Sequence, residues 1–306
     1  MRSSLLKLAV LGALGVNATS AMAGFVTLPT SGSSAYVQCR TAGNFGSGSD
    51  NTVPPVGDSA CAVPNGIGAT LLFNSTPETG YTLQNANTTA ITAFSETLGT
   101  LNERVFRNSG AGSCIYGKQV VMSNATTHDY NPQLAGNNKM EVNDYAFGGY
   151  TGAVSAGYAK ASGTNNSSAF RIGRTFTSVQ MQADPSAPSN PATGFLVLPG
   201  TAATAGTEIT GVGQTLSPGT VVPAAGEQDA PFSSSWVDFT TDVTAGVDED
   251  GSTHPSSPSM YIKQNCANAT TSSVANSMKI RQTGQETQPW VTVTTSSRAP
   301  SSTITP

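Results

Sequence analysis

The sequence predicts an all-β protein, an antiparallel β-sandwich of jelly-roll or Greek-key type with long loop insertions. Apolar and polar residues alternate in many short runs, and no long stretch shows helical periodicity. Charged residues make up only 10% of the chain, so Lys and Glu are too few to cover many helices. Strict alternation is typical of sheets with one wet face, as in antiparallel sandwiches and barrels.

The chain is expected to begin with a signal peptide, residues 1–23. Arg2 and Lys7 precede a short apolar run, and Ala21–Ala23 provides small residues before a cut ahead of Gly24. The apolar run is too short to span a bilayer, and the glycine after the cut disfavours a bacterial lipoprotein. The peptide resembles those of Gram-negative bacteria. We therefore expect an exported protein, located outside the cell, on its surface or in the periplasm.

The rest of the chain is predicted to form one β-rich domain, residues 24–300. Two stretches rich in Gly, Ser, Asn, Ala and Pro, at about 41–68 and 183–230, lack periodicity and are expected to be loop insertions. One domain is favoured over two because cysteines that we expect to pair lie on either side of the second insertion. Residues 301–306 are expected to form a disordered tail.

The four cysteines predict two disulfide bonds, because an even number in an exported chain favours pairing. Three pairings are possible. The favoured one joins Cys39 to Cys61 across a local loop and leaves Cys114 and Cys266 to tie two distant strands. No CxxC motif is present, which disfavours a zinc or redox site.

The first half of the chain is predicted to contain several short strands, at 24–29, 34–39, 69–74 and 102–108. At most one short helix is expected, near Thr88–Glu96. The clearest strand here is 114–122, because alternate residues share one face, namely Tyr116, Lys118, Val120 and Met122.

The middle of the chain adds predicted strands at 139–147 and 194–200, and a run at 170–182 whose phase slips. Phe176 lies in one phase and Val179 in the other. A bulge between these two residues would restore one apolar face.

Toward the C-terminus four further strands are predicted, at 235–243, 259–266, 277–282 and 289–295. Each run places two apolar residues on one face: Val237 and Phe239, Met260 and Ile262, Met278 and Ile280, Val291 and Val293. The total is about a dozen strands.

The net charge of the chain is −4, which restricts the classes of partner that we expect it to bind. Nucleic acids and anionic membranes attract clusters of Lys and Arg, so an acidic chain argues against both. Glycans, other surface proteins or a second copy of the chain are the partners that we expect, without membrane insertion.

The densest run of charge, Val247–His254, is a candidate calcium loop. It departs from an EF-hand at the two diagnostic positions, where Thr253 and Ser259 replace Gly and Glu. The alternative is an acidic turn between a strand that ends near Val243 and one that begins near Met260, since Asp-Gly and His-Pro are strong turn signals. The candidate ligands of a looser calcium site are Asp242, Asp248, Asp250 and Ser252.

No catalytic residue is predicted. The two histidines, His128 and His254, lack the spacing of a metal site, and the chain has no GxSxG, SxxK or HExxH motif. Glu103, Glu141 and Asp144 supply carboxylates of the kind that glycosidases use, but many β proteins offer such pairs. Whether the chain is an enzyme stays open, and the balance is against it.

Aromatic residues gather in the sequence NDYAFGGYTGAVSAGY, which is the candidate ligand site. Tyrosines beside Asn and Asp stack on sugar rings in many proteins, whereas the alternative is packing in the core. The candidate ligand-binding residues are Tyr145, Phe147, Tyr150 and Tyr158.

Four strings, GSCIYGKQVVM, GRTFTSVQMQ, SWVDFTTDV and KIRQTGQETQPWVTV, resemble exported proteobacterial "choice-of-anchor" proteins, in which a β-rich domain precedes varied C-terminal anchors. The resemblance covers about 98–300, apart from the second insertion. This chain departs from the pattern because it shows no recognisable anchor. The resemblance implies a β-rich surface protein and no catalytic residue. We therefore expect a secreted or cell-surface structural or adhesive protein, with a carbohydrate-binding module or polysaccharide-acting enzyme as the alternative.

Overall fold

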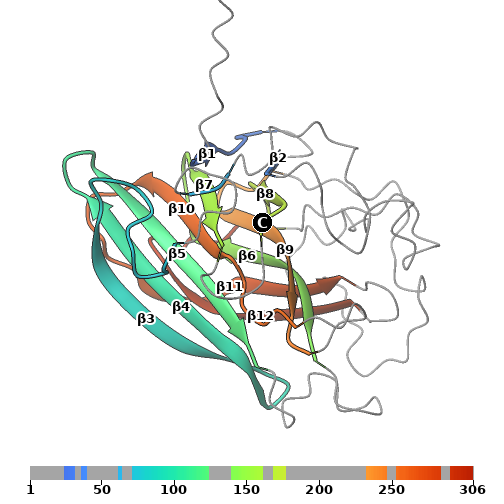
Figure 1. Cartoon of the computed structure of the whole chain (residues 1–306). Helices are drawn as coiled ribbons and strands as arrows, with labels where there is room; N and C mark the ends of the chain where they lie inside the picture. Colours follow the sequence, from blue (N-terminus) through green and yellow to red (C-terminus); the bar gives the residue numbers. More distant parts are fainter. Residues whose placement is uncertain are drawn as a thin grey trace, which may run out of the picture.

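The computed structural model describes residues 24–31, 36–39, 61–63, 71–123, 139–160, 168–176, 232–246, 253–283 and 290–305. Over these residues the chain is all-β, with twelve strands in two antiparallel sheets of six and no helix (Figure 1). No helix long and apolar enough to cross a membrane occurs among them. The prediction of an all-β chain with about a dozen strands is therefore confirmed.

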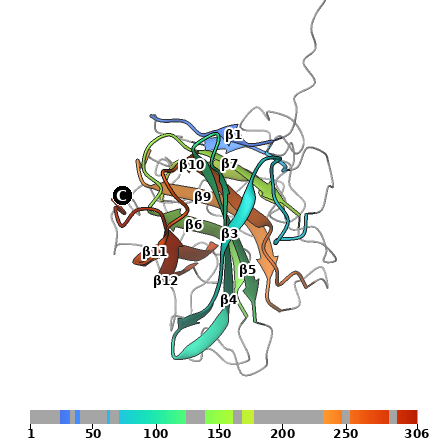
Figure 2. The same cartoon turned by 90° about the vertical axis from the view of Figure 1, so that its left-hand side faces the viewer.

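The first sheet has the order β1-β7-β10-β5-β4-β3. Its strands are β1 (Val26–Thr27), β7 (Ser155–Ala159), β10 (Ser259–Asn265), β5 (Ser113–Met122), β4 (Glu96–Asn108) and β3 (Thr82–Ala93). The β3–β4 hairpin is the longest in the sheet and extends below the other strands in Figure 2.

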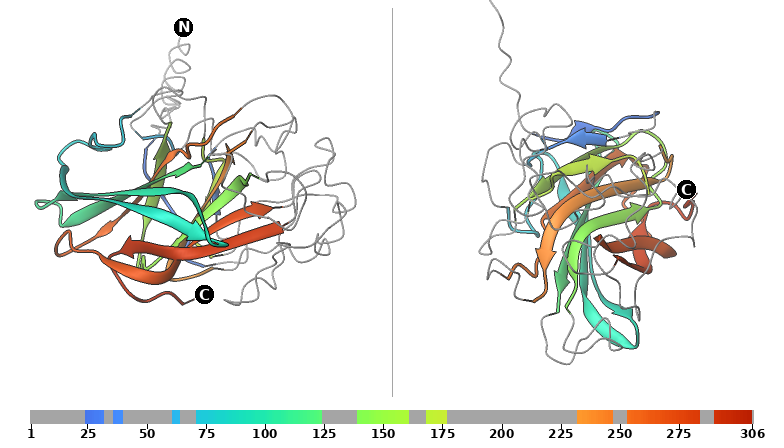
Figure 3. Two further views of the ribbon diagram at one scale, coloured as in Figure 1. Left: turned by 90° about the horizontal axis from the view of Figure 1, so that it is seen from below. Right: turned by 90° about the vertical axis from the view of Figure 1, so that its right-hand side faces the viewer.

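The second sheet has the order β12-β11-β6-β9-β8-β2. Its strands are β12 (Trp290–Ala299), β11 (Ser272–Thr283), β6 (Glu141–Gly148), β9 (Trp236–Thr244), β8 (Arg171–Gly173) and β2 (Tyr36–Gln38). Its edge strand β12 lies beside β3 of the first sheet, as the view from below shows (Figure 3).

The chain passes repeatedly from one sheet to the other, because β5, β7 and β10 belong to the first sheet and β6, β8, β9 and β11 to the second. As a result β10 is inserted between β5 and β7, and β6 lies between β9 and β11. Neither sheet is built by one half of the chain alone.

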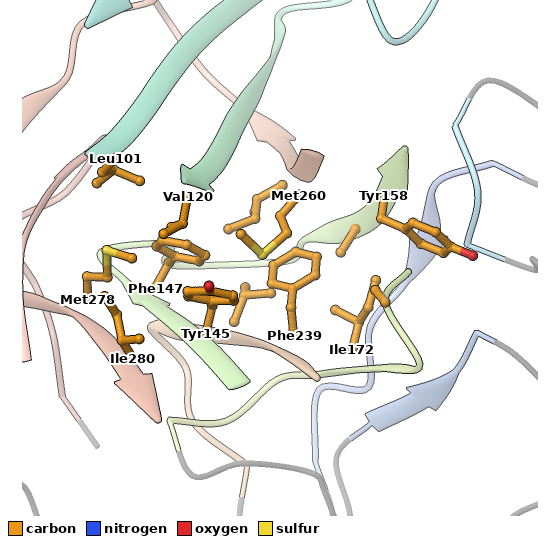
Figure 4. Packing of buried hydrophobic residues seen from close by; sticks show 14 of the residues in the cluster. Leu101, Val120, Tyr145, Phe147, Tyr158, Ile172, Phe239, Met260, Met278 and Ile280 are labelled. Atoms are coloured by element: carbon orange, nitrogen blue, oxygen red, sulfur yellow. The ribbon is translucent and has the colours of Figure 1, made fainter. Parts of the chain in front are cut away.

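The two sheets share one buried cluster of apolar side chains. Leu101, Val120 and Met260 of the first sheet face Phe147 and Phe239 of the second (Figure 4). The alternation in the sequence selects these residues correctly: on β5 the predicted face of Tyr116, Lys118, Val120 and Met122 is the buried inner one. Burial of this continuous apolar surface is the main term that stabilises the fold.

Both predicted disulfide pairings are confirmed. Cys39 and Cys61 are bonded with their Cα atoms 5.1 Å apart, and Cys114 and Cys266 with theirs 5.7 Å apart. Cys39 follows β2 of the second sheet, whereas the backbone of Cys61 accepts a hydrogen bond from Tyr158 on β7 of the first. The first disulfide therefore links the two sheets, and the second joins neighbouring strands of one sheet.

Two local predictions are wrong. The helix expected near Thr88–Glu96 is instead the end of β3, a turn and the start of β4. The strand expected at 69–74 does not form, since Leu71–Asn74 is coil and turn. At 88–96 the structure comes from pairing of β3 with the next strand, β4, which local helical propensity does not report.

The end of the chain packs onto the second sheet, so a tail disordered throughout 301–306 is also wrong. The carbonyl of Thr305 accepts hydrogen bonds from the hydroxyls of Ser233 and Ser235, at 3.0 and 2.7 Å. Ile304 packs against Trp236. The short apolar anchor Ile304 among polar neighbours gave little sequence signal.

Several predictions lie outside the described residues. They are most of the insertion at 41–68, the whole insertion at 183–230, the signal peptide, the strand at 194–200 and the bulge before Val179.

Candidate functional site

The four aromatic residues predicted to bind a ligand all lie in the core, at 0–1% exposure: Tyr145, Phe147, Tyr150 and Tyr158. Tyr145 and Phe147 lie on β6 and point between the sheets (Figure 4). The ring of Tyr150 meets that of Tyr116 edge-on, with centroids 5.5 Å apart. The four rings pack against other side chains, so in this structure they are part of the hydrophobic core. A sugar site on them stays a prediction.

The candidate calcium ligands are not brought together in the part that is described. Asp242 lies on β9, whereas Asp248, Asp250 and Ser252 lie outside the described residues, as does His128. The flanking structure agrees with a strand connection, because β9 ends at Thr244 and β10 begins at Ser259.

His254 lies where this connection returns to the sheet. Its backbone forms an antiparallel bridge with Thr244, with both N–H···O distances at 3.1 Å. The described residues contain no group of three or more metal-binding side chains. Calcium binding at the loop stays a prediction.

The most concentrated polar chemistry among the described residues is a buried ion pair on the inner face of the first sheet. Lys118 Nζ lies 2.5 Å from Glu103 Oε1, and both side chains are buried. The two residues are direct partners across β5 and β4. Lys118 Nζ also donates to the carbonyl of Arg298 on β12, and the Arg298 backbone N–H donates to Glu103 at 2.7 Å.

Burial sets the electrostatics of this pair. Desolvation lowers the pKa of Lys118, and the charge and hydrogen bond of Glu103 raise it only in part. The ammonium lies 5.6 Å from the centre of the Phe147 ring on β6, a cation–π arrangement. Lys118 therefore contacts β12 and β6 of the opposite sheet, so the pair is a polar link between the sheets.

A small pocket lies beside the pair and includes Asn87, Tyr116 and Thr271 in its lining. It has room for about one water molecule. Pockets that hold a sugar or another small ligand are many times larger. The Glu103–Lys118 pair thus lacks space for a substrate, and its arrangement suits a structural role.

A second buried ion pair lies in the other sheet. Arg281 Nη1 on β11 is 2.5 Å from Asp144 Oδ1 on β6 and 3.9 Å from Asp238 Oδ1 on β9. The same guanidinium also donates to the carbonyl of Phe176. Of the carboxylates considered for glycoside hydrolysis, Asp144 is thus held by a cation in this sheet and Glu103 by another cation in the first.

The hydrogen bonds of the Arg174 guanidinium go to backbone carbonyls instead of a carboxylate. Its guanidinium donates to the carbonyls of Trp236, Tyr150, Gly152 and Ser234. Desolvation lowers its pKa to about 10. This side chain therefore fixes the loop after β6 against the start of β9.

The outer strand β3 offers a different kind of surface. Among the described residues it pairs only with β4, and most of its side chains are exposed. Its sequence, TLQNANTTAITA, has no charge and no proline. A long uncharged edge strand is a template for pairing with another strand.

Exposed apolar side chains lie at both ends of the same strand. In the described part of the chain the exposed large hydrophobic residues are Leu72, Leu83 and Phe94, at 63, 41 and 36% exposure. Leu83 is near the start of β3, Phe94 is in the turn that follows it, and Leu72 lies on the segment that precedes it. They do not form one contiguous patch, but two of the three belong to the β3–β4 hairpin, which makes the hairpin the candidate interaction surface.

The turn between β3 and β4 is also strained. Phe94 and Ser95 have φ of +55° and +65°, the left-handed conformation that glycine and asparagine adopt most readily. A large aromatic residue in such a position, with its side chain exposed, is more costly than the Asn-Gly that usually fills this turn. Backbone strain of this kind clusters at functional sites.

No protein-family model, curated protein or solved structure matches this chain.

Sequence reasoning missed the β3 edge and the Glu103–Lys118 link. Alternation placed Lys118 on the same strand face as Val120 and Met122, which was a signal for a buried cation needing a partner. The edge had no comparable signal, because a neutral polar run with little alternation does not reveal its place in a sheet.

Proposed function

We propose that this chain is an exported structural or adhesive protein that makes contact through its β3–β4 hairpin. In this proposal the two sheets form a β-sandwich of Greek-key type, held by its two disulfides. The observation that carries the proposal is the position of the exposed apolar residues: two of the three large ones in the described chain, Leu83 and Phe94, lie on β3 and in its turn.

The hairpin combines features of a contact element. It has long strands of 12 and 13 residues, and it lies at the edge of its sheet. Its outer strand presents amide and hydroxyl side chains, which hydrogen-bond to proteins and glycans alike and are insensitive to salt because they carry no charge. Phe94 at the tip adds an aromatic anchor of the kind enriched at interfaces.

The disulfides support the proposed location. Both cysteine pairs are at bonding distance, and such bonds persist in oxidising compartments such as the periplasm and the cell exterior. A contact protein outside the cell has to keep its fold without chaperones, which favours covalent links of this kind.

The proposal is tested in the native host by deleting the chain and returning it in variant forms. Fractionation first establishes whether the protein reaches the medium, the periplasm or the outer surface. Retention of cells on a surface and on one another is then measured under flow. The double variant Leu83→Ser with Phe94→Ser is expected to reduce retention to that of the deletion strain while its exported amount stays unchanged.

The matched control is Thr30→Ala, an exposed position just after β1, at the opposite edge of the sheet from the hairpin, that is expected to keep full retention. Equal retention by the wild type and the hairpin variant would overturn the proposal. A glycan array probed with the purified mature protein serves as the second arm: strong binding to one glycan, kept in the hairpin variant, would favour a carbohydrate-binding module instead.

A further inference from the structure

We infer that the outer edge of β3 pairs with β3 of a second copy of this chain, antiparallel about a two-fold axis at Thr88. The pairing would join two six-stranded sheets into one continuous sheet. This inference rests on the proposed function and names the partner of the hairpin.

The edge has the length and the regularity that strand addition requires. β3 extends over 12 residues, with irregularities in its pairing to β4 only at Leu83/Asn85 and Ile91/Thr92. Between them Asn85–Ile91 run in unbroken register with β4. A regular segment of seven residues is long enough to form a ladder of backbone hydrogen bonds with an added strand.

The other edges of the two sheets offer less to an added strand. β1 and β2 have only two and three residues, and β12 carries one cation, Arg298, near its end. Short edges and edge charges disfavour pairing between molecules. β3 is the long edge strand that lacks a charge and a proline, and it is the outermost strand of its sheet (Figure 1).

A second copy suits this edge because the strand is complementary to itself. With the axis at Thr88, the pairing sets Thr88 opposite Thr88, Asn87 opposite Thr89 and Ala86 opposite Ala90 of the second copy. Two threonines opposite each other form a favourable cross-strand pair, and a neutral strand meets no like charge when it pairs with itself. A strongly charged partner strand would find no complementary charge on β3.

The contact is expected to be weak for a single pair of molecules. One strand edge buries little surface, at or below the low end of specific interfaces, about 1,200 Å² in total. Many copies on one surface would strengthen it through effective concentration. The geometry therefore fits adhesion between surfaces that each carry many copies.

The test uses opposite charges at the axis, in the oxidised mature protein. Thr88 is exposed, and its hydroxyl donates only an exposed hydrogen bond to Asn102 at 2.9 Å, so substitution leaves the fold intact. The wild type is expected to dimerise as concentration rises in sedimentation velocity. Thr88→Lys alone and Thr88→Glu alone are each expected to stay monomeric, and an equimolar mixture of the two is expected to dimerise again.

Cross-linking checks the register. Residues opposite each other in an antiparallel pair have Cα atoms about 4.5–5.5 Å apart, within the range that a disulfide spans. Thr88→Cys is therefore expected to give an oxidised dimer, whereas Thr30→Cys, exposed just after β1 at the opposite edge of the sheet, is expected to remain monomeric.

The outcomes separate this inference from the proposed function. If the wild type stays monomeric at the highest soluble concentration and Thr88→Cys does not cross-link, pairing with a second copy is overturned. If, in addition, the Leu83→Ser and Phe94→Ser variant still loses retention, the hairpin is adhesive toward another molecule. If the mixture of charge variants dimerises but retention does not depend on the hairpin, the pairing stands and the adhesive function fails.

Discussion

Lys118 illustrates how one side chain joins the two sheets. Its ammonium is fully buried, so it needs compensation for the loss of water, and it finds Glu103, a carbonyl of β12 and the face of Phe147. A buried pair of this kind adds little net stability, but removal of one partner leaves an uncompensated charge.

Removal of one partner is therefore expected to cost more than removal of both. Lys118→Met should lower the free energy of unfolding by about 3–5 kcal/mol, because Glu103 is left buried without its cation. The double variant Glu103→Leu with Lys118→Met should be considerably more stable than Lys118→Met alone. Denaturant unfolding of the oxidised proteins measures both. A double variant that is the least stable of the three would contradict the interpretation.

The buried tyrosines predict the response to alkali. Burial raises the pKa of Tyr116 to about 12 and also raises the pKa values of Tyr145, Tyr150 and Tyr261 well above the ordinary value. At about pH 11 these four of the eight tyrosines should stay protonated in the folded protein, although the ordinary value is about 10. Tyrosinate absorbance should then rise sharply on addition of denaturant.

The direction in which folding stability changes with pH follows from the same pKa values. A raised folded pKa means that the unfolded chain loses protons first, so these tyrosines stabilise the fold below about pH 10 and that contribution is lost as the pH rises through their folded pKa values. Tyr116→Phe should make the alkaline loss shallower. A loss of stability that begins below pH 9 in the wild type and is unchanged in Tyr116→Phe would point to other groups.

At the scale of the element, the β3–β4 turn holds an exposed aromatic residue in a strained backbone conformation, which lowers the stability of the fold. Both turn residues have positive φ, which Asn-Gly accommodates with little strain. The double variant Phe94→Asn with Ser95→Gly is therefore expected to raise the free energy of unfolding by about 1 kcal/mol. Thermal unfolding measures the gain, and retention of cells should fall in the same variant.

Ser95→Gly alone serves as the control for this pair of effects. It relieves strain at one residue and keeps Phe94, so it should gain stability without losing retention. If the full variant gains stability and still retains cells, the strained tip has no part in adhesion.

The strands that could be predicted from sequence are those in which apolar residues alternate with more polar ones. β5, β9, β10 and β11 alternate because their inner residues, such as Val120, Phe239 and Ile280, face the shared core. β3 could not be predicted in this way. It is a polar edge with one face fully exposed and the other only partly buried, so its structure comes from pairing with β4 rather than from an apolar pattern.

The burial of a side chain was harder to predict than its strand. Tyr145 and Phe147 were named as ligand-binding candidates but lie in the core, because alternation cannot say which face of a strand is inner when both faces are apolar or when the strand is buried on both sides, as β6 is. The ion pairs depend on contacts between residues 15 and 137 positions apart, Lys118 with Glu103 and Arg281 with Asp144.

At the scale of the whole molecule the two disulfides differ in what they constrain. Cys39–Cys61 closes a separation of 22 residues and Cys114–Cys266 one of 152. In the chain-entropy model the first is worth about 3 kcal/mol and the second about 5 kcal/mol. Replacing Cys114 and Cys266 by alanine should therefore destabilise the protein more than replacing Cys39 and Cys61. Denaturant midpoints would show the difference.

Because the shorter disulfide links the sheets, its loss should have a second effect. Proteolysis near β2 should increase in the variant without Cys39–Cys61 even where global stability changes less, since local opening at that end needs no global unfolding. Equal protease sensitivity of the two disulfide variants would contradict this assignment of roles.

The Cys114–Cys266 bond would also transmit force if the β3–β4 hairpin carried mechanical load. A pull along β3 acts on its hydrogen bonds to β4 in shear, so that many bonds share the force, and the load passes through β4 to β5. There it meets a covalent link from the start of β5 to the end of β10, at the centre of the sheet. Tension applied at the edge would thus be carried into the interior by a bond that does not yield, and rupture would fall on the edge strand, which can pair again.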